Sequence, residues 1–579
     1  MSSPTSIRDI DLTPLPGKSY FSIEREWREE FIYFLMVDRF QDGGNRTPVN
    51  QQGRSAGIPA GSVFYGGTLQ GITRNLDYIT GLGCTAIWLS PIFTNTPDGY
   101  HGYHINNYLE IDPHFGTKDD LVELVTAAHG YQKNGQAFPI RIILDVVINH
   151  SGDNWFYQFE DLPATKPYMY YNDTIYNFGD WRTPDHPIPS ELRDPDKYHR
   201  MGNITSGGYD RSPENLHGDI DGLKDYNNED TPRGSDLVNI LIKVHSYWIR
   251  EADIDGFRVD AVKHMGALAC SWFCSNIREY AWSLGKKGFF LFGELATPDD
   301  GIYNRYIGPN TSGQDGGNTV FFGIDSLLDF RLAEGADASR GPLRGVITGT
   351  SDPFTLFDRL RAQQYRALNR GEMGRYLVSF VDNHDSFWQS GRIGSLANDA
   401  QVIASVGFLL CALGTPCIYY GTEQGFSGRG GDPDIREAMF DRNDPSTSLL
   451  NTHCTIYRSI AQIAAVVQAQ PALRFGRMYY RPIAGNTPTF ADGRDFGLPF
   501  GTDYTLAFSR LLYGSEILVA YNVSSRPRKD FVVIDNSWHQ PGDTLTFLYG
   551  AAGTKTVARI GTTTYIQLEL DPYQFVILG

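Results

Sequence analysis

The stretch Ile140–His150 reads IRIILDVVINH, a run of apolar and β-branched residues that ends in polar side chains. Runs of the same kind recur along the chain, with helical patterns between them. They are Phe31–Val37, Thr85–Leu89, Ile254–Val259, Gly288–Phe292, Tyr376–Val381 and Cys417–Tyr420. Continuous apolar strands that alternate with helices are typical of a parallel sheet covered on both faces.

A further run near Val320–Ile324 brings the set to eight, and eight such strands predict a (β/α)8 TIM barrel. The alternative is a doubly wound open sheet. That fold would need a glycine-rich phosphate loop after its first strand, and none follows Phe31–Val37. In a barrel the carboxyl ends of the strands converge on one face, so we expect the functional side chains there.

The barrel pattern is interrupted after the third strand and stops near residue 470. Residues 151–221 are rich in Asp, Pro, Tyr and Asn and poor in helical pattern, which predicts an inserted domain that overhangs the cleft. After about Pro471, alternating segments between Gly, Asn, Asp and Pro predict an antiparallel β-sandwich. We therefore expect an α/β barrel over residues 1–150 and 222–470, an inserted domain over 151–221 and a C-terminal β-sandwich domain over 471–579.

The composition is that of a globular protein with an acidic surface. Hydrophobic residues make up 41% of the chain and charged residues 20%, which excludes a disordered chain. The formal net charge of −17 argues against nucleic acid and anionic membranes as partners, but not against a neutral polysaccharide. Aromatic residues, at 13%, suit a sugar-binding cleft but equally the core of a large β-rich enzyme.

The cysteines and the first residues of the chain indicate the cellular compartment in which we expect the protein. None of the six cysteines forms a CxxC pair and several lie in apolar runs, so we expect buried free thiols. The segment Met1–Gly17 has no apolar signal core, and no run of about 18 uncharged apolar residues suggests a membrane span. These features favour the cytoplasm, with secretion as the alternative if a signal peptide has been removed. We expect a monomer.

Three acidic residues, Asp260, Glu294 and Asp385, end three separate strands. In a barrel they would share one pocket, where charges are costly unless they are used. Glycoside hydrolysis needs two carboxyl groups, one to protonate the leaving oxygen and one to attack the anomeric carbon or activate water. Each acid alone could be a salt-bridge or capping residue, whereas the three together predict an active site.

Three basic side chains accompany these acids. Arg258 precedes Asp260 by two residues, so both leave the same face of the strand, and a guanidinium there would keep the carboxylate ionised and nucleophilic. Glu294 follows an apolar run, which would raise its pKa as a general acid requires. His150 and His384 can donate hydrogen bonds to sugar hydroxyls, although each alone would be an ordinary structural histidine.

Four segments resemble, in order and spacing, the signature segments of the α-amylase family of glycoside hydrolases. They are Asp145–His150, Gly256–His264, Phe292–Glu294 and Phe380–Asp385. Further similarity extends the resemblance over nearly the whole chain. It lies at Tyr100–Tyr103, Ile111–Pro113 and Gly414–Gly421.

The resemblance implies a retaining enzyme that hydrolyses α-1,4-glucosidic bonds in starch, glycogen or maltooligosaccharides. Asp260 would be the nucleophile that forms a covalent glycosyl intermediate, Glu294 the acid/base, and Asp385 the third carboxylate, which binds substrate hydroxyls. Transglycosylation through the same intermediate is the alternative within the class, decided by water exclusion at the acceptor side. A non-catalytic glucan-binding protein is the alternative outside it, and would lack at least one of the three acids.

The resemblance also implies substrate-binding residues. The −1 subsite would be lined by Tyr103, His150, Arg258 and His384. Lys263 and His264 would help form the +1 and +2 subsites, as in α-amylases proper, and Asp432 and Arg436 the −2 subsite. The family often has Trp where His104 stands, so the fine shape of the −1 and −2 subsites, and with it the product pattern, stays open.

A calcium site between the barrel and the inserted domain is implied as well. Hard cations take several oxygen ligands. The matching positions are Asn149, Asp225 and the backbone carbonyl of His264, and the resemblance leaves a further ligand from the inserted domain unplaced.

Overall fold

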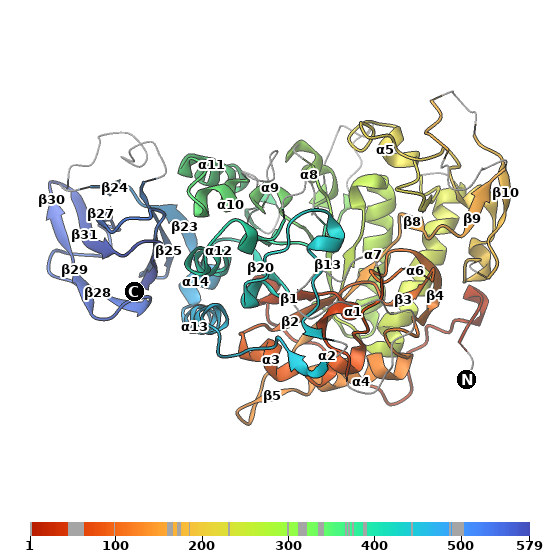
Figure 1. The fold of residues 1–579 in the computed structure, drawn as a ribbon, viewed down its shortest axis with the longest axis horizontal. Helices are drawn as coiled ribbons and strands as arrows, with labels where there is room; N and C mark the ends of the chain where they lie inside the picture. Colours follow the sequence, from red (N-terminus) through yellow and green to blue (C-terminus); the bar gives the residue numbers. More distant parts are fainter. Residues whose placement is uncertain are drawn as a thin grey trace.

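A computed structural model of the chain arranges eight parallel strands in one sheet that closes into a barrel (Figure 1). The strands are β1 (Ile32–Leu35), β2 (Ala86–Leu89), β7 (Arg141–Val146), β12 (Gly256–Val259), β13 (Phe290–Gly293), β16 (Ser326–Leu327), β19 (Val378–Ser379) and β20 (Thr415–Tyr419). Their order along the sheet is β16-β13-β12-β7-β2-β1-β20-β19. A parallel bridge from Leu328 to Val378 joins the two outer strands, which confirms the predicted (β/α)8 barrel.

The structure describes residues 3–43, 63–97, 99–158, 166–170, 175–184, 186–229, 232–297, 300–307, 309–310, 321–333, 341–364, 367–368, 371–372, 374, 376–385, 391–441, 444–485, 488 and 503–579. Within these ranges every residue of β1, β2, β7, β12 and β13 is buried. Burial on both faces explains why these strands read as continuous apolar runs rather than as alternating patterns.

The predicted position of the remaining strand is wrong. Within Val320–Ile324, the described pair Phe321–Phe322 forms β15, which pairs antiparallel with β14 (Pro309–Asn310) outside the barrel; Val320 itself lies outside the described residues. The barrel strand is β16, a few residues later, and it pairs in parallel with β13. An apolar run therefore marked a hairpin strand, while the barrel strand itself is too short to show a pattern.

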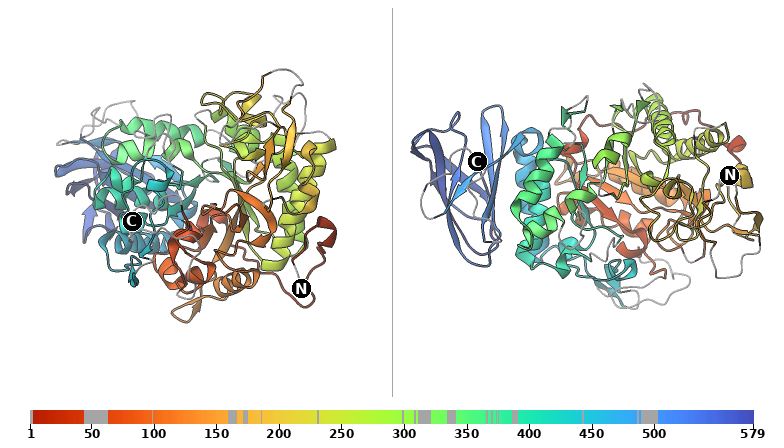
Figure 2. Two further views of the ribbon diagram at one scale, coloured as in Figure 1. Left: turned by 45° about the vertical axis from the view of Figure 1, so that its right-hand side comes forward. Right: turned by 90° about the horizontal axis from the view of Figure 1, so that it is seen from above.

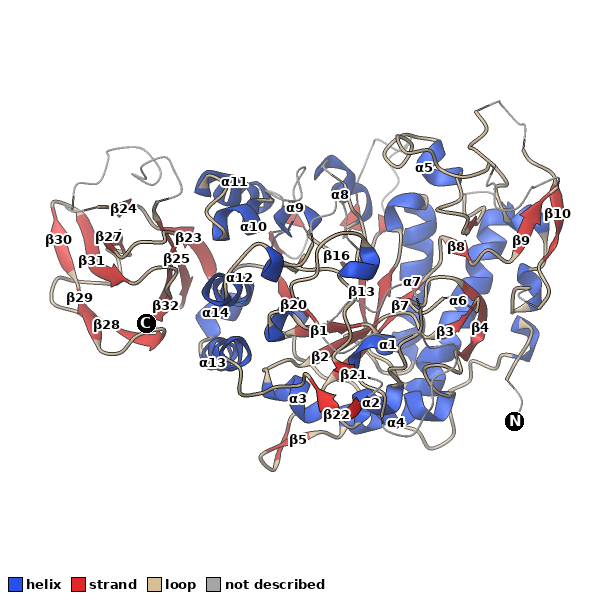
Figure 3. Cartoon of the chain, in the orientation of Figure 1, coloured by secondary structure: helices blue, strands red, loops and turns tan. Residues whose placement is uncertain are grey.

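Helices surround the barrel (Figure 3). The longest are α4 (Lys118–His129), α6 (Pro232–Ala252), α7 (Ala267–Ser283), α12 (Asp399–Cys411) and α13 (Thr455–Ala469). Helix α4 begins with a capping box in which the side chains of Thr117 and Asp120 each accept a backbone N–H from the other residue. Helix α12 is buried from Gln401 to Cys411 because it contacts both the barrel strand β20 and the C-terminal strand β32 (Phe575–Leu578).

The inserted segment, between β7 and α6, leaves the barrel at the carboxyl end of β7 and covers one end of the molecule (Figure 1). Its elements are β8 (His150–Ser151), β9 (Trp155–Tyr157), β10 (Phe178–Trp181), η3 (Ser190–Leu192), η4 (Pro195–Lys197), α5 (Glu214–His217) and β11 (Lys224–Asp225). The buried indole of Trp155 packs against the rings of Phe178 and Tyr198. Strands β8 and β11 pair antiparallel, which sets His150 opposite Asp225 where the segment begins and ends.

The C-terminal region consists of two antiparallel sheets, as expected, at the end of the molecule opposite the inserted segment (Figure 2). The six-stranded sheet has the order β23-β25-β26-β32-β28-β29 and the four-stranded sheet the order β24-β27-β31-β30. The strands not yet bounded are β23 (Arg477–Tyr480), β24 (Ile483–Ala484), β25 (Thr505–Leu512), β26 (Ser515–Asn522), β27 (Arg528–Val533), β28 (Thr544–Tyr549), β29 (Thr554–Thr556), β30 (Ala558–Ile560) and β31 (Thr563–Leu570).

The six cysteines are free thiols, as predicted, and all except Cys454 are buried. None of the described helices combines the length and the apolar character needed to cross a membrane.

Candidate active site

A cleft of about 580 Å³ opens where the barrel strands end. Most of the predicted site residues line it. These are Tyr103, His104, His150, Asp260, Lys263, His264, Glu294, Asp385, Asp432 and Arg436. Arg258 and His384 are buried beside the lining residues, and Asn149 and Asp225 are buried among the elements of the inserted segment.

Arg258, at 0% exposure, links the two predicted catalytic carboxyl groups. Its Nη1 donates to Oδ1 of Asp260 over 2.6 Å, and its Nη2 donates to Oε2 of Glu294 over 2.8 Å. The two acids follow the neighbouring parallel strands β12 and β13, so both reach the same planar guanidinium.

Asp145 was not predicted as a site residue, but it completes this network. In the pairing of β7 with β12 it lies opposite Arg258, and its carboxylate accepts from Nη1 over 3.0 Å and 3.1 Å. The Tyr103 hydroxyl and the Trp88 indole also donate to Asp145, over 2.8 Å and 3.1 Å. The signal in the sequence was a single acid within the apolar run Ile142–Val146, which has to be paired when it is buried.

The sequence predicted an ionised Asp260 and a raised pKa for Glu294, and in the ligand-free cleft both pKa values shift in the opposite direction. Burial raises the pKa of Asp260 well above its usual range, with Arg258 opposing and the Glu294 carboxylate reinforcing the effect. Burial also acts to raise the pKa of Glu294, but the Arg258 guanidinium and the backbone N–H of Ala261, 3.2 Å away, lower it. The expectation that apolar surroundings alone raise the pKa of Glu294 is therefore wrong, because the guanidinium lies within the same pocket.

Asp385 is held by Arg436, which donates to it through Nη2 over 2.9 Å. The same nitrogen lies 3.2 Å from Asp432, and Nε donates to the backbone carbonyl of His384 over 2.8 Å. Burial raises the pKa of Asp385 to about 7, with Arg436 opposing and Asp432 reinforcing it. The structure thus brings together the third carboxylate and the predicted −2 pair, and adds Tyr100, whose hydroxyl accepts from Arg436 over 2.9 Å.

His150 and His384 are uncharged near neutral pH, because burial disfavours the imidazolium form. Burial lowers the pKa of His150 to about 3 and that of His384 well below its usual range. His384 stacks on the Tyr103 ring at 5.3 Å between centroids. His101, which was not predicted, also lines the cleft, with its ring 4.5 Å from that of His104. Neutral imidazoles can both donate to and accept from sugar hydroxyls.

Lys263 and His264 connect the barrel side of the cleft to the inserted segment. Lys263 Nζ lies 2.7 Å from Oδ1 of Asp210 and donates to the carbonyl of Ala296 over 2.9 Å. The His264 ring bonds through Nδ1 to the carbonyl of Asn215 over 2.8 Å. Both residues line the cleft where the inserted segment meets the barrel, and their part in the acceptor subsites stays a prediction.

Asn149 and Asp225, the side chains predicted to bind calcium, are in contact. Asn149 Nδ2 donates to Oδ1 of Asp225 over 3.1 Å, while Asn149 Oδ1 is buried without a hydrogen-bond partner in the described part of the chain. Burial and the neighbouring Asp219 carboxylate raise the pKa of Asp225 well above its usual range. An orphaned amide oxygen beside buried carboxylates is chemistry that suits a hard cation.

A family model described as the catalytic domain of α-amylase matches residues 34–453 of the chain. A barrel that gathers these acids and this arginine at its strand ends is the architecture of that class, and the chain belongs to the α-amylase family.

Among curated proteins, the chain is 31% identical to an α-amylase of Streptomyces lividans, over 86% of this chain and 57% of that protein. It is 29% identical to a cyclomaltodextrin glucanotransferase of Klebsiella oxytoca, over 74% of this chain and 64% of that protein. The chain thus spans less than two thirds of the length of these relatives. Among solved structures, an α-amylase of Geobacillus thermoleovorans complexed with acarbose is 27% identical, with a TM-score of 0.67 over 96% of this chain and 99% of that chain.

Proposed function

We propose that the protein is a retaining glycoside hydrolase that cleaves α-1,4-glucosidic bonds in starch, glycogen or maltooligosaccharides. The observation that carries the proposal is the single guanidinium of Arg258, which holds the carboxyl groups of Asp260 and Glu294 together at the base of the cleft. Two carboxyl groups placed close together favour nucleophilic attack by one of them, rather than attack by a water molecule between them.

In the first step Asp260 attacks the anomeric carbon, and Glu294 gives its proton to the glycosidic oxygen as that bond breaks. In the second step Glu294 takes a proton from water, which attacks the glycosyl–Asp260 ester and restores the original configuration. Asp385 and Arg436 orient the hydroxyls of the distorted sugar, and neutral His150 and His384 complete its hydrogen bonding.

The proton of the pair must lie on Glu294 when the glycosidic bond breaks. In the ligand-free cleft Arg258 and the Ala261 N–H lower the pKa of Glu294, while burial raises the pKa of Asp260, so the ligand-free arrangement favours the proton on the wrong partner. We infer that a bound glucan draws Glu294 away from Arg258 and excludes water. The guanidinium then serves Asp260 and Asp145 alone, Asp260 ionises, and Glu294 becomes the stronger base and takes the proton.

Transglycosylation is the second candidate, and the similarity to cyclomaltodextrin glucanotransferases favours keeping it. Both reactions share the intermediate on Asp260 and differ in whether water or a sugar hydroxyl resolves it. On this proposal Lys263, which lines the cleft and lies 2.7 Å from Asp210 of the inserted segment, would hold the acceptor sugar.

Calcium is the proposed structural ion, held by Asn149 and Asp225 with the His264 carbonyl as the further predicted ligand. A divalent cation there would supply positive charge to buried oxygens and tie the inserted segment to the barrel. The catalytic steps on Asp260 and Glu294 do not involve it.

The test compares Glu294→Gln with wild type on maltoheptaose, with Glu569→Gln in the C-terminal domain as the matched control. Loss of the proton donor predicts a fall of several orders of magnitude in kcat, with maltoheptaose still bound. Near-normal turnover by Glu294→Gln would contradict the assignment. A time course of the wild-type products separates hydrolysis, which yields shorter glucans only, from transfer, which also yields longer ones.

A further inference from the structure

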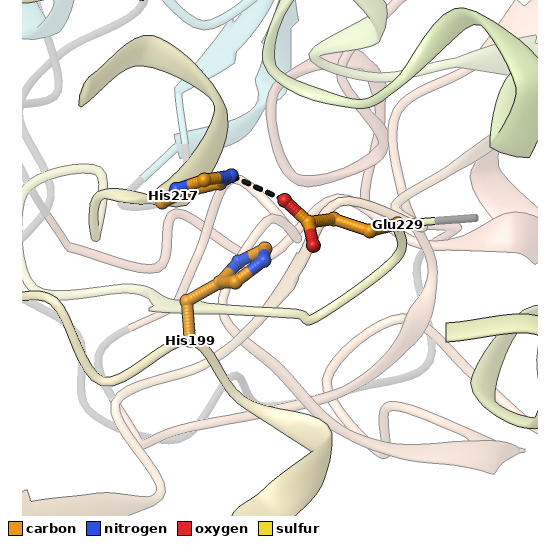
Figure 4. Close-up of side chains that lie close together, drawn as sticks. All are labelled: His199, His217 and Glu229. Carbon is orange, nitrogen blue, oxygen red and sulfur yellow. Dashed lines mark hydrogen bonds and ion pairs between the residues drawn. The ribbon is translucent and has the colours of Figure 1, made fainter. Parts of the chain in front are cut away.

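Three segments at the end of the inserted region bring His199, His217 and Glu229 together (Figure 4). His199 follows η4, His217 ends α5, and Glu229 precedes α6. One ligand atom from each residue lies within 4.8 Å of those of the other two. Nε2 of His217 lies 2.6 Å from Oε1 of Glu229. The cluster lies outside the catalytic cleft, because none of the three residues lines it.

His199 is oriented like a metal ligand. Its side chain is only 8% exposed, and its Nδ1 lies 2.5 Å from Oδ2 of Asp225. A carboxylate accepts the Nδ1 proton and thereby fixes the tautomer in which Nε2 carries a free lone pair. That Nε2 is buried and has no hydrogen-bond partner among the residues described. A buried imidazole nitrogen without a partner is costly unless a ligand fills the space beside it.

We propose that His199, His217 and Glu229 form a binding site for a first-row transition-metal ion, with Zn²⁺ as the best-suited ion. Two imidazoles and one carboxylate are borderline ligands that suit Zn²⁺, whereas calcium prefers oxygen ligands only. The site is separate from the proposed calcium site, although Asp225 serves both. Its Oδ1 contacts Asn149, and its Oδ2 orients His199.

The geometry needs only a small adjustment to accept the ion. Zinc bonds of about 2.0–2.1 Å in a tetrahedron place ligand atoms about 3.3 Å apart. The three ligand atoms already lie within 4.8 Å of one another, and the Glu229 side chain is 46% exposed, so it can move to accommodate the ion. His217 is 23% exposed, which leaves a path from solvent and a fourth position for water.

The position of the site gives the ion a structural consequence. Helix α5 carries both His217 and Asn215, and the carbonyl of Asn215 holds the ring of His264 in the cleft. An ion shared by three separate segments would fix α5, and with it the wall of the cleft that the inserted segment forms. We therefore expect zinc to raise thermal stability without being needed for the catalytic steps.

The test measures zinc binding to the full-length protein, freed of metal and then saturated with Ca²⁺ to block the neighbouring site. Competition with a chromophoric zinc chelator is expected to give one Zn²⁺ per chain. Replacement by Co²⁺ is expected to give the visible spectrum of a four-coordinate ion. His217→Ala and Glu229→Gln, at partly exposed positions, should weaken zinc affinity by at least the roughly 10–100-fold that outer-shell changes cost. The exposed His453→Ala is the matched control and should bind like wild type.

The same measurements contain the results that would overturn the site. Zinc binding that excess Ca²⁺ abolishes would place the ion at Asn149 and Asp225 instead. Equal affinity in wild type and in His217→Ala, with both variants folded by circular dichroism, would place the zinc elsewhere. Failure of the wild type to compete with a chelator of micromolar zinc affinity would show that the cluster is an ordinary hydrogen-bonded group.

Discussion

Nη2 of Arg258 lies 2.8 Å from Oε2 of Glu294, so the proposed acid/base is tied to a buried cation in the ligand-free cleft. This contact keeps the carboxyl group ionised until substrate arrives. On the proposed mechanism, binding prepares the general acid, because the bound glucan replaces the guanidinium as a hydrogen-bond partner of Glu294.

Arg258→Lys is expected to abolish this arrangement, because an ammonium group cannot hold Asp145, Asp260 and Glu294 in one plane. Unpaired buried carboxylates should lower the free energy of unfolding by about 3–5 kcal/mol at neutral pH, and kcat should fall by more than about 100-fold. Urea denaturation and steady-state kinetics measure the two effects. Arg278→Lys, whose partner Asp325 is partly exposed, is the matched control and should lose about 1 kcal/mol or less.

Asp385→Asn is expected to stabilise the protein in a pH-dependent way. The folded-state pKa is about 7, against about 3.9 in an unfolded chain, so the folded wild type binds the extra proton between these values. The wild type therefore loses stability as the pH rises from about 4 to about 7, and the variant does not. The free energy of unfolding of the variant should exceed that of the wild type by about 1–4 kcal/mol at pH 8. Denaturation at several pH values measures this difference. A difference that is constant with pH would contradict this account.

Lys263→Ala is expected to weaken the acceptor side of the cleft selectively. The variant loses the link to Asp210 and a donor facing the cleft, so KM for maltoheptaose should rise about 10-fold, equivalent to about 1.4 kcal/mol. A short chromogenic maltoside that does not reach this side should be cleaved with unchanged kcat. Lys555→Ala in the C-terminal domain is the control. Equal losses on both substrates would place Lys263 outside the acceptor site.

Calcium should reverse the order of stability between wild type and Asp225→Asn. With Ca²⁺ the wild type should melt higher, because an ion bound only by the folded state stabilises it, by about 1 °C for each kcal/mol in a chain of 579 residues. Without Ca²⁺ the variant should melt as high as the wild type or higher, because it removes a buried charge beside Asp219. Thermal melts of both proteins with chelator and after adding Ca²⁺ measure this reversal. The same order under both conditions would exclude Asp225 as a ligand.

The barrel could be predicted from the sequence because strands buried on both faces show as continuous apolar runs. The apolar run Ile254–Val259 contains β12 (Gly256–Val259). The prediction was wrong at Val320–Ile324, where an apolar pair forms a hairpin strand and the two-residue strand β16 follows it. Local pattern reports the apolar character of a strand, and it does not report which neighbour that strand pairs with. The boundaries of the three domains stay predictions.

The sequence predicted the three acids of the candidate site, but it did not predict how their surroundings shift their pKa values. Asp260, Glu294 and Asp385 follow strand ends, and the structure places all three in the cleft. Asp145 and the true surroundings of Glu294 depend on the register of β7 and β13 against β12, which brings both to Arg258. Register between strands far apart in the chain is a property of the assembled sheet, so sequence pattern could not supply it.

Among the described residues, the barrel is closed between β16 and β19 by the bridge from Leu328 to Val378 and by the hydrogen bond from the Asp329 amide to the Val378 carbonyl over 2.9 Å. The Ser326 hydroxyl also donates to the Tyr376 carbonyl across this joint. The contact between β16 and β19 is the weakest in the barrel sheet, so its amides should exchange with solvent before those of the other strands. Glu294 and Asp385 lie on opposite sides of this contact, since Glu294 follows β13 and Asp385 lies beyond β19. A glucan that contacts both acids would hold the two sides of the barrel together and slow the exchange of the Asp329 amide.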